Sequence, residues 1–288
     1  AEIMQAEATE VMDELDGRVT SQADAVFVVA GLGGGTGSGG APMLARELKR
    51  VYTMPIYGLA VLPGRDEGAI YQANAGRSLK TFTREADSVL VIDNDAWKTS
   101  DESIEEGFAA INDRIAERVG LLLAAGEIVE GVGESVVDSS EIINTLKNGG
   151  IASLGYASAL ADEDAGENIN AITSTARKAL LTGTSLPQAV EADKALLVIA
   201  GHPDRIARKG VERARKWLEE ETGSLEVRGG DFPLSSDRIA ALVLLGGVER
   251  SQRVQEFMDR AREASKQQEE PQESARDAFQ NDELDDLM

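Results

Sequence analysis

Gly31-Leu-Gly-Gly-Gly-Thr-Gly-Ser-Gly-Gly40 carries the strongest structural signal in this chain, because seven of its ten residues are glycine. It follows a short continuous apolar run, Ala25-Val-Phe-Val-Val-Ala30, of the kind that forms a strand buried on both faces of a parallel sheet. After it, apolar residues recur at helical spacing from residue 39 to just beyond residue 50. A glycine-rich turn between a buried strand and an amphipathic helix is typical of a phosphate-binding site.

The chemistry of this turn suits an anion. Glycines have no Cβ and let backbone amides approach a phosphate closely, and the first amides of a helix add unpaired donors and the positive end of the helix dipole. Two hydroxyl side chains in the turn add further donors. The predicted phosphate-binding residues are Gly33, Gly34, Gly35, Thr36, Gly37 and Ser38. The alternative is a glycine-rich turn that holds no ligand.

The run GGGTGSG resembles the signature of the tubulin/FtsZ superfamily of GTPases, and it lacks the lysine of a Walker motif. The wider runs VFVVAGLGGGTGSGGAPMLARELKRVY and PIYGLAVLPGRDEG are similar to the archaeal CetZ branch, and the resemblance extends from residue 1 to about residue 262. It implies an α/β fold in which a Rossmann-like GTPase domain with a parallel sheet is joined by a central helix to a smaller α/β C-terminal domain.

The expected domain boundaries follow from this resemblance and from composition. Residues 1–125 form the GTP-binding domain, 126–148 a loop and the following helix, 149–264 the C-terminal domain, and 265–288 a tail. Relatives in the superfamily begin with a strand and a further glycine loop, so we expect the N-terminal part of the first domain to be missing. The tail is acidic and poor in apolar residues, which predicts disorder. It either docks a protein partner or only keeps the chain in solution.

Two polar residues follow the next predicted strands, residues 56–62 and 88–92. Parallel strands place ligands at their carboxyl ends, where Glu67 and Asn94 are expected. The resemblance implies that Glu67 holds the ribose of the nucleotide and that Asn94 recognises guanine. From the residues alone, Glu67 could be a solvated loop charge and Asn94 a turn residue. Tyr71 stands where many FtsZ proteins carry an arginine that reaches the phosphates.

A long helix is predicted from about residue 101 to residue 124. Phe108 and Asn112 are four residues apart and therefore share one face of it. The resemblance implies that they complete the base site, with the ring stacking on guanine and the amide bonding to it. From spacing alone, Phe108 would more often be a core residue.

Asp138 and Glu141 form the second constellation, in Val136-Val-Asp-Ser-Ser-Glu141. Three residues apart, they would lie on one face of a first helical turn, where they also satisfy the pattern of a capping box. The run VVDSSEIINTL resembles the superfamily's synergy loop, whose acids act on the nucleotide of the next subunit. The resemblance therefore implies that both acids are catalytic, although Val136 stands where FtsZ carries an asparagine.

Composition bounds the remaining possibilities. The 288 residues carry 29 basic against 51 acidic side chains, a net charge of −22, which argues against nucleic acid or an anionic membrane as a direct partner. With no cysteine and a single histidine, His202, thiolate chemistry and a multi-histidine metal site are excluded. The sequence has neither a signal peptide nor an apolar run of about eighteen residues, so we expect a cytoplasmic protein that does not insert into membranes.

Three functions are compatible with these features. The first is a GTPase that binds GTP and GDP, with Mg²⁺ accompanying GTP, and polymerises head to tail, with a role in archaeal cell shape. The second is a nucleotide-dependent α/β enzyme that does not polymerise, which would need an independent catalytic group near the glycine turn; none is evident. The third is a scaffold that binds nucleotide and polymerises without efficient hydrolysis.

The strong negative charge predicts a protein adapted to high salt, because screening removes the self-repulsion of an acidic surface. We expect the midpoint of thermal unfolding to be markedly higher in molar KCl than in dilute buffer. An ordinary acidic protein would unfold at the same temperature in both solutions, and that result would rule out the halophilic interpretation.

Overall fold

The computed structural model describes residues 2–15, 17–19, 22–97, 104–127, 137–249 and 251–279. Its helices and strands follow one another in this order: α1 (Glu2–Ala6), α2 (Ala8–Leu15), β1 (Val26–Gly31), α3 (Gly35–Val51), β2 (Ile56–Leu62), α4 (Ala69–Glu85), β3 (Ser88–Asp93), η1 (Asn94–Ala96), α5 (Ile104–Gly126), α6 (Ser139–Leu146), β4 (Ile151–Leu160), α7 (Asn168–Leu181), β5 (Ala192–Gly201), η2 (Pro203–Arg205), α8 (Arg208–Thr222), β6 (Glu226–Pro233), β7 (Arg238–Val248) and α9 (Gln252–Phe279).

Within the described residues, all the strands belong to one seven-stranded sheet in the order β1-β2-β3-β4-β7-β5-β6. Strands β1 to β4 are parallel to one another, whereas β7 runs antiparallel to both β4 and β5. The α/β architecture predicted from the sequence is confirmed. The two halves share this sheet rather than forming separate ones.

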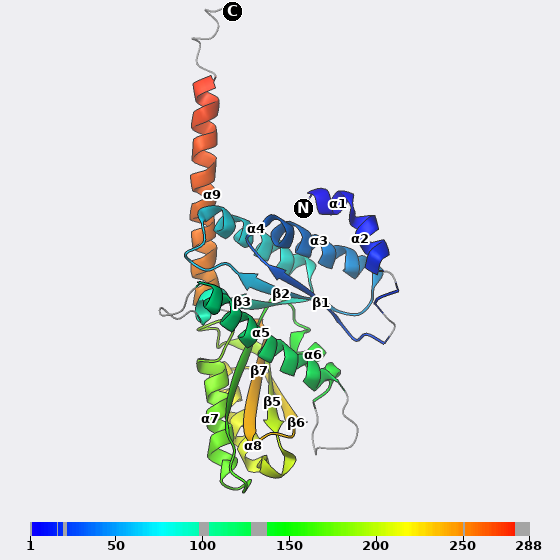
Figure 1. The fold of residues 1–288 in the computed structure, drawn as a ribbon, viewed down its shortest axis with the longest axis vertical. Coiled ribbons are helices and arrows are strands. Elements are labelled where there is room, and N and C mark those ends of the chain that lie inside the picture. The colour runs from blue at the N-terminus through cyan, green and yellow to red at the C-terminus, as the bar shows by residue number, and fades with distance from the viewer. Residues whose placement is uncertain are drawn as a thin grey trace, which may run out of the picture.

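Helices cover both faces of the first half of the sheet (Figure 1). On one face α3 and α4 bury an apolar cluster against the strands, which includes Leu48 and Phe82. On the other face α5 packs through Leu122 and Ala125 against Tyr57 of β2, in a second cluster that continues into β4, β5 and β7. Helix α5 therefore contacts the cores of both halves, as expected of a central helix.

Helix α3 begins earlier than the sequence pattern predicts. The apolar periodicity starts near residue 39, but the helix already includes Gly35 to Gly40. Glycine has a low intrinsic helix propensity, so this first turn depends on tertiary contacts with the end of β1. The predicted phosphate-binding residues consequently lie partly in a loop and partly in the first turn of a helix.

The region predicted to be a disordered tail is also different in the structure. Helix α9 continues to Phe279, beyond the predicted boundary at residue 264, and its distal part extends away from the body of the protein (Figure 1). Glutamate, glutamine and alanine make up eight of the fifteen residues from 265 to 279, and these three residue types favour helix even without a buried apolar face, although Pro271 lies within the stretch. Residues 280–288, with part of the predicted docking segment, lie outside the described residues.

The first half of α9 packs on the half of the molecule that contains β1 to β3 and is not confined to the predicted C-terminal domain. It packs along α4 (Figure 1), and Phe257 joins the apolar cluster under α3 and α4. Removing this ring should therefore destabilise the first half of the sheet.

We expect Phe257→Ala to lower the free energy of unfolding by about 3–5 kcal/mol, because Phe257 is only 2% exposed and its loss leaves a cavity. Leu225→Ala is the matched control, since Leu225 is 98% exposed. Denaturant unfolding of both variants measures the difference. If Phe257→Ala unfolds at the same denaturant concentration as the control, α9 is not part of the core.

Candidate functional site

The glycine turn has backbone N–H groups that a ligand could use, because no N-cap side chain accepts hydrogen bonds from them. Gly34 is the N-cap of α3 and has no side chain that could accept a hydrogen bond from the first helical amides. Those amides have no acceptor within the helix because of helix geometry. The Gly33 amide is already used, since it donates to Ser38 Oγ at 2.7 Å. The open donors therefore belong to the first turn of α3, at Gly35, Thr36 and Gly37.

Two glycines in the turn are required by geometry. Gly33 has a φ of +116°, which side chains rarely tolerate. Gly37 lies so close to the end of β1 that a Cβ there would be 2.0 Å from the Gly31 carbonyl oxygen. The start of α3 is thus pressed directly onto the carboxyl end of the strand.

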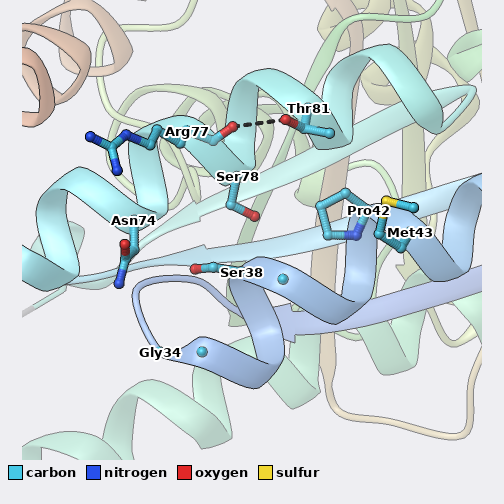
Figure 2. Close-up of a pocket in the computed structure, with 10 residues that line it drawn as sticks. Gly34, Ser38, Pro42, Met43, Asn74, Arg77, Ser78 and Thr81 are labelled. Atoms are coloured by element: carbon cyan, nitrogen blue, oxygen red, sulfur yellow. Dashed lines mark hydrogen bonds between the residues drawn. The ribbon is translucent and has the colours of Figure 1, made fainter. Parts of the chain in front are cut away.

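A cavity of about 300 Å³ opens beside this turn, between α3 and α4 (Figure 2). Helix α3 contributes the glycines and Ser38, and α4 contributes Asn74, Arg77 and Ser78. Asn74 Nδ2 donates to the Gly33 carbonyl at 3.1 Å and so supports the strained turn from the side. Figure 2 shows Ser78 projecting from α4 toward α3, and its buried Oγ has no hydrogen-bond partner in the structure.

Asn74 and Arg77 were not identified from the sequence. They lie three residues apart on the helix that follows Glu67, and this spacing places them on one face of α4. Arg77 brings a positive charge to the cavity. Tyr71, at the position where FtsZ carries arginine, instead packs against Gly33.

Glu67 follows β2 and is half-buried. Its Oε1 accepts a hydrogen bond from the Gly64 amide at 2.7 Å, which fixes the carboxylate within its own loop. It is therefore not a freely solvated loop charge, and Oε1 is fixed by the protein itself.

Asn94 follows β3 as the first residue of η1, and its Oδ1 is buried without a hydrogen-bond partner in the structure. The neighbouring Asp93 and Asp95 both pair with Arg253 at the start of α9, Asp95 at 3.0 Å. Burial raises the pKa of Asp93 to about 6, against the opposing effect of the hydrogen bond that its carboxylate accepts from the Asp95 amide. Arg253 of α9 thus binds the residues on both sides of Asn94. The buried Asn94 Oδ1, which has no hydrogen-bond partner, is therefore held at a defined position.

The N-terminal half of α5 lies against this loop. Ile111 of α5 and Trp97 share an apolar cluster with Leu59 and Ile92 of the strands. Phe108 is 43% exposed and Asn112 is exposed, so neither side chain is buried in the core. The interpretation of Phe108 as a core residue is therefore wrong.

A buried cation fixes α5 in this position. The guanidinium of Arg118 lies 4.3 Å from the centre of the Trp97 ring and donates to the Gly183 carbonyl at 2.7 Å. Burial lowers the pKa of Arg118 to about 10. No local pattern in the sequence indicates this contact, because Gly183 lies 65 residues further along the chain.

Asp138 and Glu141 lie at the other end of α5. From Asn112 to the end of α5 at Gly126 the helix rises by roughly 21 Å, and α6 begins only after that. Figure 1 shows α6 beside the C-terminal end of α5. The structure therefore does not bring these two acids to the glycine turn, Glu67 or Asn94 of the same chain.

The two acids have different local roles. Asp138 is the N-cap of α6 and accepts from the Ser140 amide at 2.9 Å and the Glu141 amide at 3.2 Å. The Ser140 hydroxyl, which also donates to it, holds the pKa of Asp138 below its usual value. Glu141 instead accepts from Arg228 of β6. The capping interpretation thus holds for Asp138, while Val136 lies outside the described residues.

No group of three or more acidic, histidine or cysteine side chains among the described residues could hold a metal ion. None of the helices described is long and apolar enough to cross a membrane.

Comparison with known proteins identifies the family. Residues 1–101 match the model of the Tubulin/FtsZ family GTPase domain, and residues 101–263 match that of the tubulin-like CetZ C-terminal domain. The tubulin-like protein CetZ2 of Haloferax volcanii is 65% identical over the whole of this chain, which spans 80% of that protein. CetZ1 of the same organism is 49% identical over 92% of this chain, which spans 73% of CetZ1.

Solved structures give the same result. The GTPγS-bound protofilament of Haloferax volcanii CetZ2 superposes with a TM-score of 0.88, covering 93% of this chain and 78% of that one. The GDP-bound monomer of CetZ1, at 49% identity, gives 0.82 over 92% of this chain and 77% of the other. The chain belongs to the tubulin/FtsZ superfamily, in its CetZ family of tubulin-like proteins.

Proposed function

We propose that this protein binds GTP and polymerises head to tail in the cytoplasm, and that Asp138 and Glu141 of one subunit complete the hydrolytic site of the next. The observation that carries the proposal is that α6, which bears both acids, lies at the start of β1, where Ser139 Oγ donates to Asp24 at 2.7 Å, whereas the glycine turn follows the other end of that strand. Acids so placed can reach a nucleotide only if a second copy presents it. The protofilament of CetZ2, which contains GTPγS, supports this arrangement.

The nucleotide would lie across the carboxyl ends of β1, β2 and β3. Amides at the start of α3 and the hydroxyls of Thr36 and Ser38 would bind the phosphates, assisted by the helix dipole. Glu67 has a second carboxylate oxygen with which it can accept from the ribose. The buried Oδ1 of Asn94 matches the donor edge of guanine, with Phe108 and Asn112 closing the base site from α5.

At a subunit contact, the carboxylates would orient a water molecule for in-line attack on the γ-phosphorus, releasing GDP and phosphate. Loss of the γ-phosphate would weaken the contact that it had helped to form. We expect Mg²⁺ to accompany GTP in this site.

A second function is a scaffold that binds nucleotide and polymerises without efficient hydrolysis. The feature that favours it is Val136, which stands two residues before Asp138 at the position where FtsZ carries an asparagine. In either case we propose a role in archaeal cell shape, and docking of a partner at the C-terminal tail stays a prediction.

Dilution distinguishes these functions. We expect phosphate release per molecule in molar KCl to fall steeply below a critical protein concentration, because the site needs two copies. Glu141→Gln should lower phosphate release at least tenfold while GTP-dependent pelleting persists. A rate per molecule that does not change on dilution would contradict the shared site, and pelleting without phosphate release in the wild type would indicate the scaffold.

The two roles of Asp138 can be separated by a pair of variants. Asp138→Ala removes both the charge and the cap and should cost about 1 kcal/mol of unfolding free energy. Asp138→Asn keeps a capping oxygen, so its stability should stay near that of the wild type. If Asp138 is catalytic, both variants lose phosphate release; if it only caps α6, Asp138→Asn retains it.

A further inference from the structure

Arg228 of β6 forms an ion pair with Glu141, whose carboxylate is catalytic in the proposed function. Its Nη1 donates to both oxygens of Glu141, at 2.9 and 3.0 Å, and its Nε donates to Glu226 at 2.5 Å. One planar guanidinium thus joins an acid on helix α6 to an acid on its own strand. The two residues are far apart in the chain, so the contact exists only in the folded protein.

A second contact fixes the same helix to the same strand. Asn144, one helical turn after Glu141, donates to Glu226 at 3.2 Å and accepts from Lys194 Nζ at 3.1 Å. Lys194 in turn pairs with Glu226 at 3.0 Å. Glu226 is therefore held by two cations and an amide, which gives Arg228 a fixed anchor from which to orient Glu141.

The location of this network has an electrostatic consequence. A shared site must bring Asp138 and Glu141 against a nucleotide that carries several negative charges, on a chain whose net charge is −22. Like charges in contact oppose such an approach. Arg228 is the cation bound directly to one of these acids, and its side chain is 44% exposed while that of Glu141 is 29% exposed. Both groups therefore remain accessible to an approaching subunit.

We propose that Arg228 is a positioning residue for GTP hydrolysis: it orients the carboxylate of Glu141 at the subunit contact and offsets its negative charge there. This inference rests on the proposed function, in which Glu141 acts on the neighbour's nucleotide. A carboxylate has about four lone-pair directions, and a single Nη1 group occupies only part of them. Glu141 therefore keeps acceptor capacity for a water molecule while its rotamer is fixed.

The arrangement distinguishes arginine from lysine. Arg228 serves Glu141 and Glu226 through two different nitrogens of one rigid plane, whereas a lysine ammonium is a single point charge on a flexible stem. Lysine would restore the charge but not the fixed geometry. A conservative substitution therefore separates the two contributions of this side chain.

The test compares phosphate release per unit of pelleted polymer in molar KCl for wild type, Arg228→Gln, Arg228→Lys and Glu141→Gln. We expect Arg228→Gln to lower this rate about ten- to a hundredfold and Arg228→Lys to recover part of the loss. The double variant Arg228→Gln/Glu141→Gln should be no slower than Glu141→Gln alone, because both substitutions act on one carboxylate. Arg238→Gln is the matched control, since Arg238 is an exposed arginine on β7 whose guanidinium donates to the neutral hydroxyl of Ser158.

Each outcome of this test either supports or overturns the positioning role of Arg228. A wild-type rate per polymer in Arg228→Gln, or losses that multiply in the double variant, would overturn the positioning role. A loss shared equally by Arg238→Gln would reduce it to a general charge effect. If Glu141→Gln itself hydrolyses GTP normally, the proposed function fails first, and that failure is distinct from a failure at Arg228. Unfolding curves identify any variant whose loss reflects misfolding.

Discussion

The close approach of α3 to the end of β1 is the constraint on which the site depends. Gly37 lies against the Gly31 carbonyl with no room for a Cβ, so the first amides of α3 are fixed relative to the carboxyl edge of the sheet. Side chains from α4, chiefly Asn74, brace the turn from the other side. Donors that are fixed before a ligand arrives need little reordering on binding, which is the physical value of building a phosphate site on a rigid helix start.

The two ends of helix α5 lie beside different groups of predicted site residues. One end carries Phe108 and Asn112 beside the loop that contains Asn94, and the other end leads to α6 with Asp138 and Glu141. Arg118 contacts the Trp97 ring and the Gly183 carbonyl and so fixes the position of this helix. The proposed base-binding residues lie at one end of α5 and the proposed catalytic acids lie near the other end. This arrangement suits head-to-tail assembly, in which the acids of one copy meet the nucleotide of the next.

Much of the fold could be predicted from local patterns, and the reasons are visible in particular elements. The buried strands and the glycine turn were recognisable because apolar runs and glycine spacing report local structure. The start of α3 was predicted four residues late because contact with β1, not propensity, stabilises its first turn. The tail was predicted to be disordered because its sequence lacks an apolar face, although its residues favour helix.

Long-range contacts could not be predicted in the same way. The pairs Arg228 with Glu141 and Arg253 with Asp93 join residues far apart in the chain, and nothing in their local sequence distinguishes these arginines from solvated ones. The predicted site residues therefore came from motifs, while the side chains that hold them came only from the structure.

The join between the two halves of the sheet is narrow. Strands β3 and β4 pair only through Val89 with Ile151 and Leu90 with Ala152, whereas β4 and β7 pair along eight positions, from Ser153 to Leu160. Few strand pairs therefore join the halves at this place, and the apolar cluster around α5, which runs from β2 into β4, β5 and β7, supplies further contact between them. In a filament of the kind proposed, a small tilt between the halves at this seam would be repeated in every copy and would change the curvature of the whole filament.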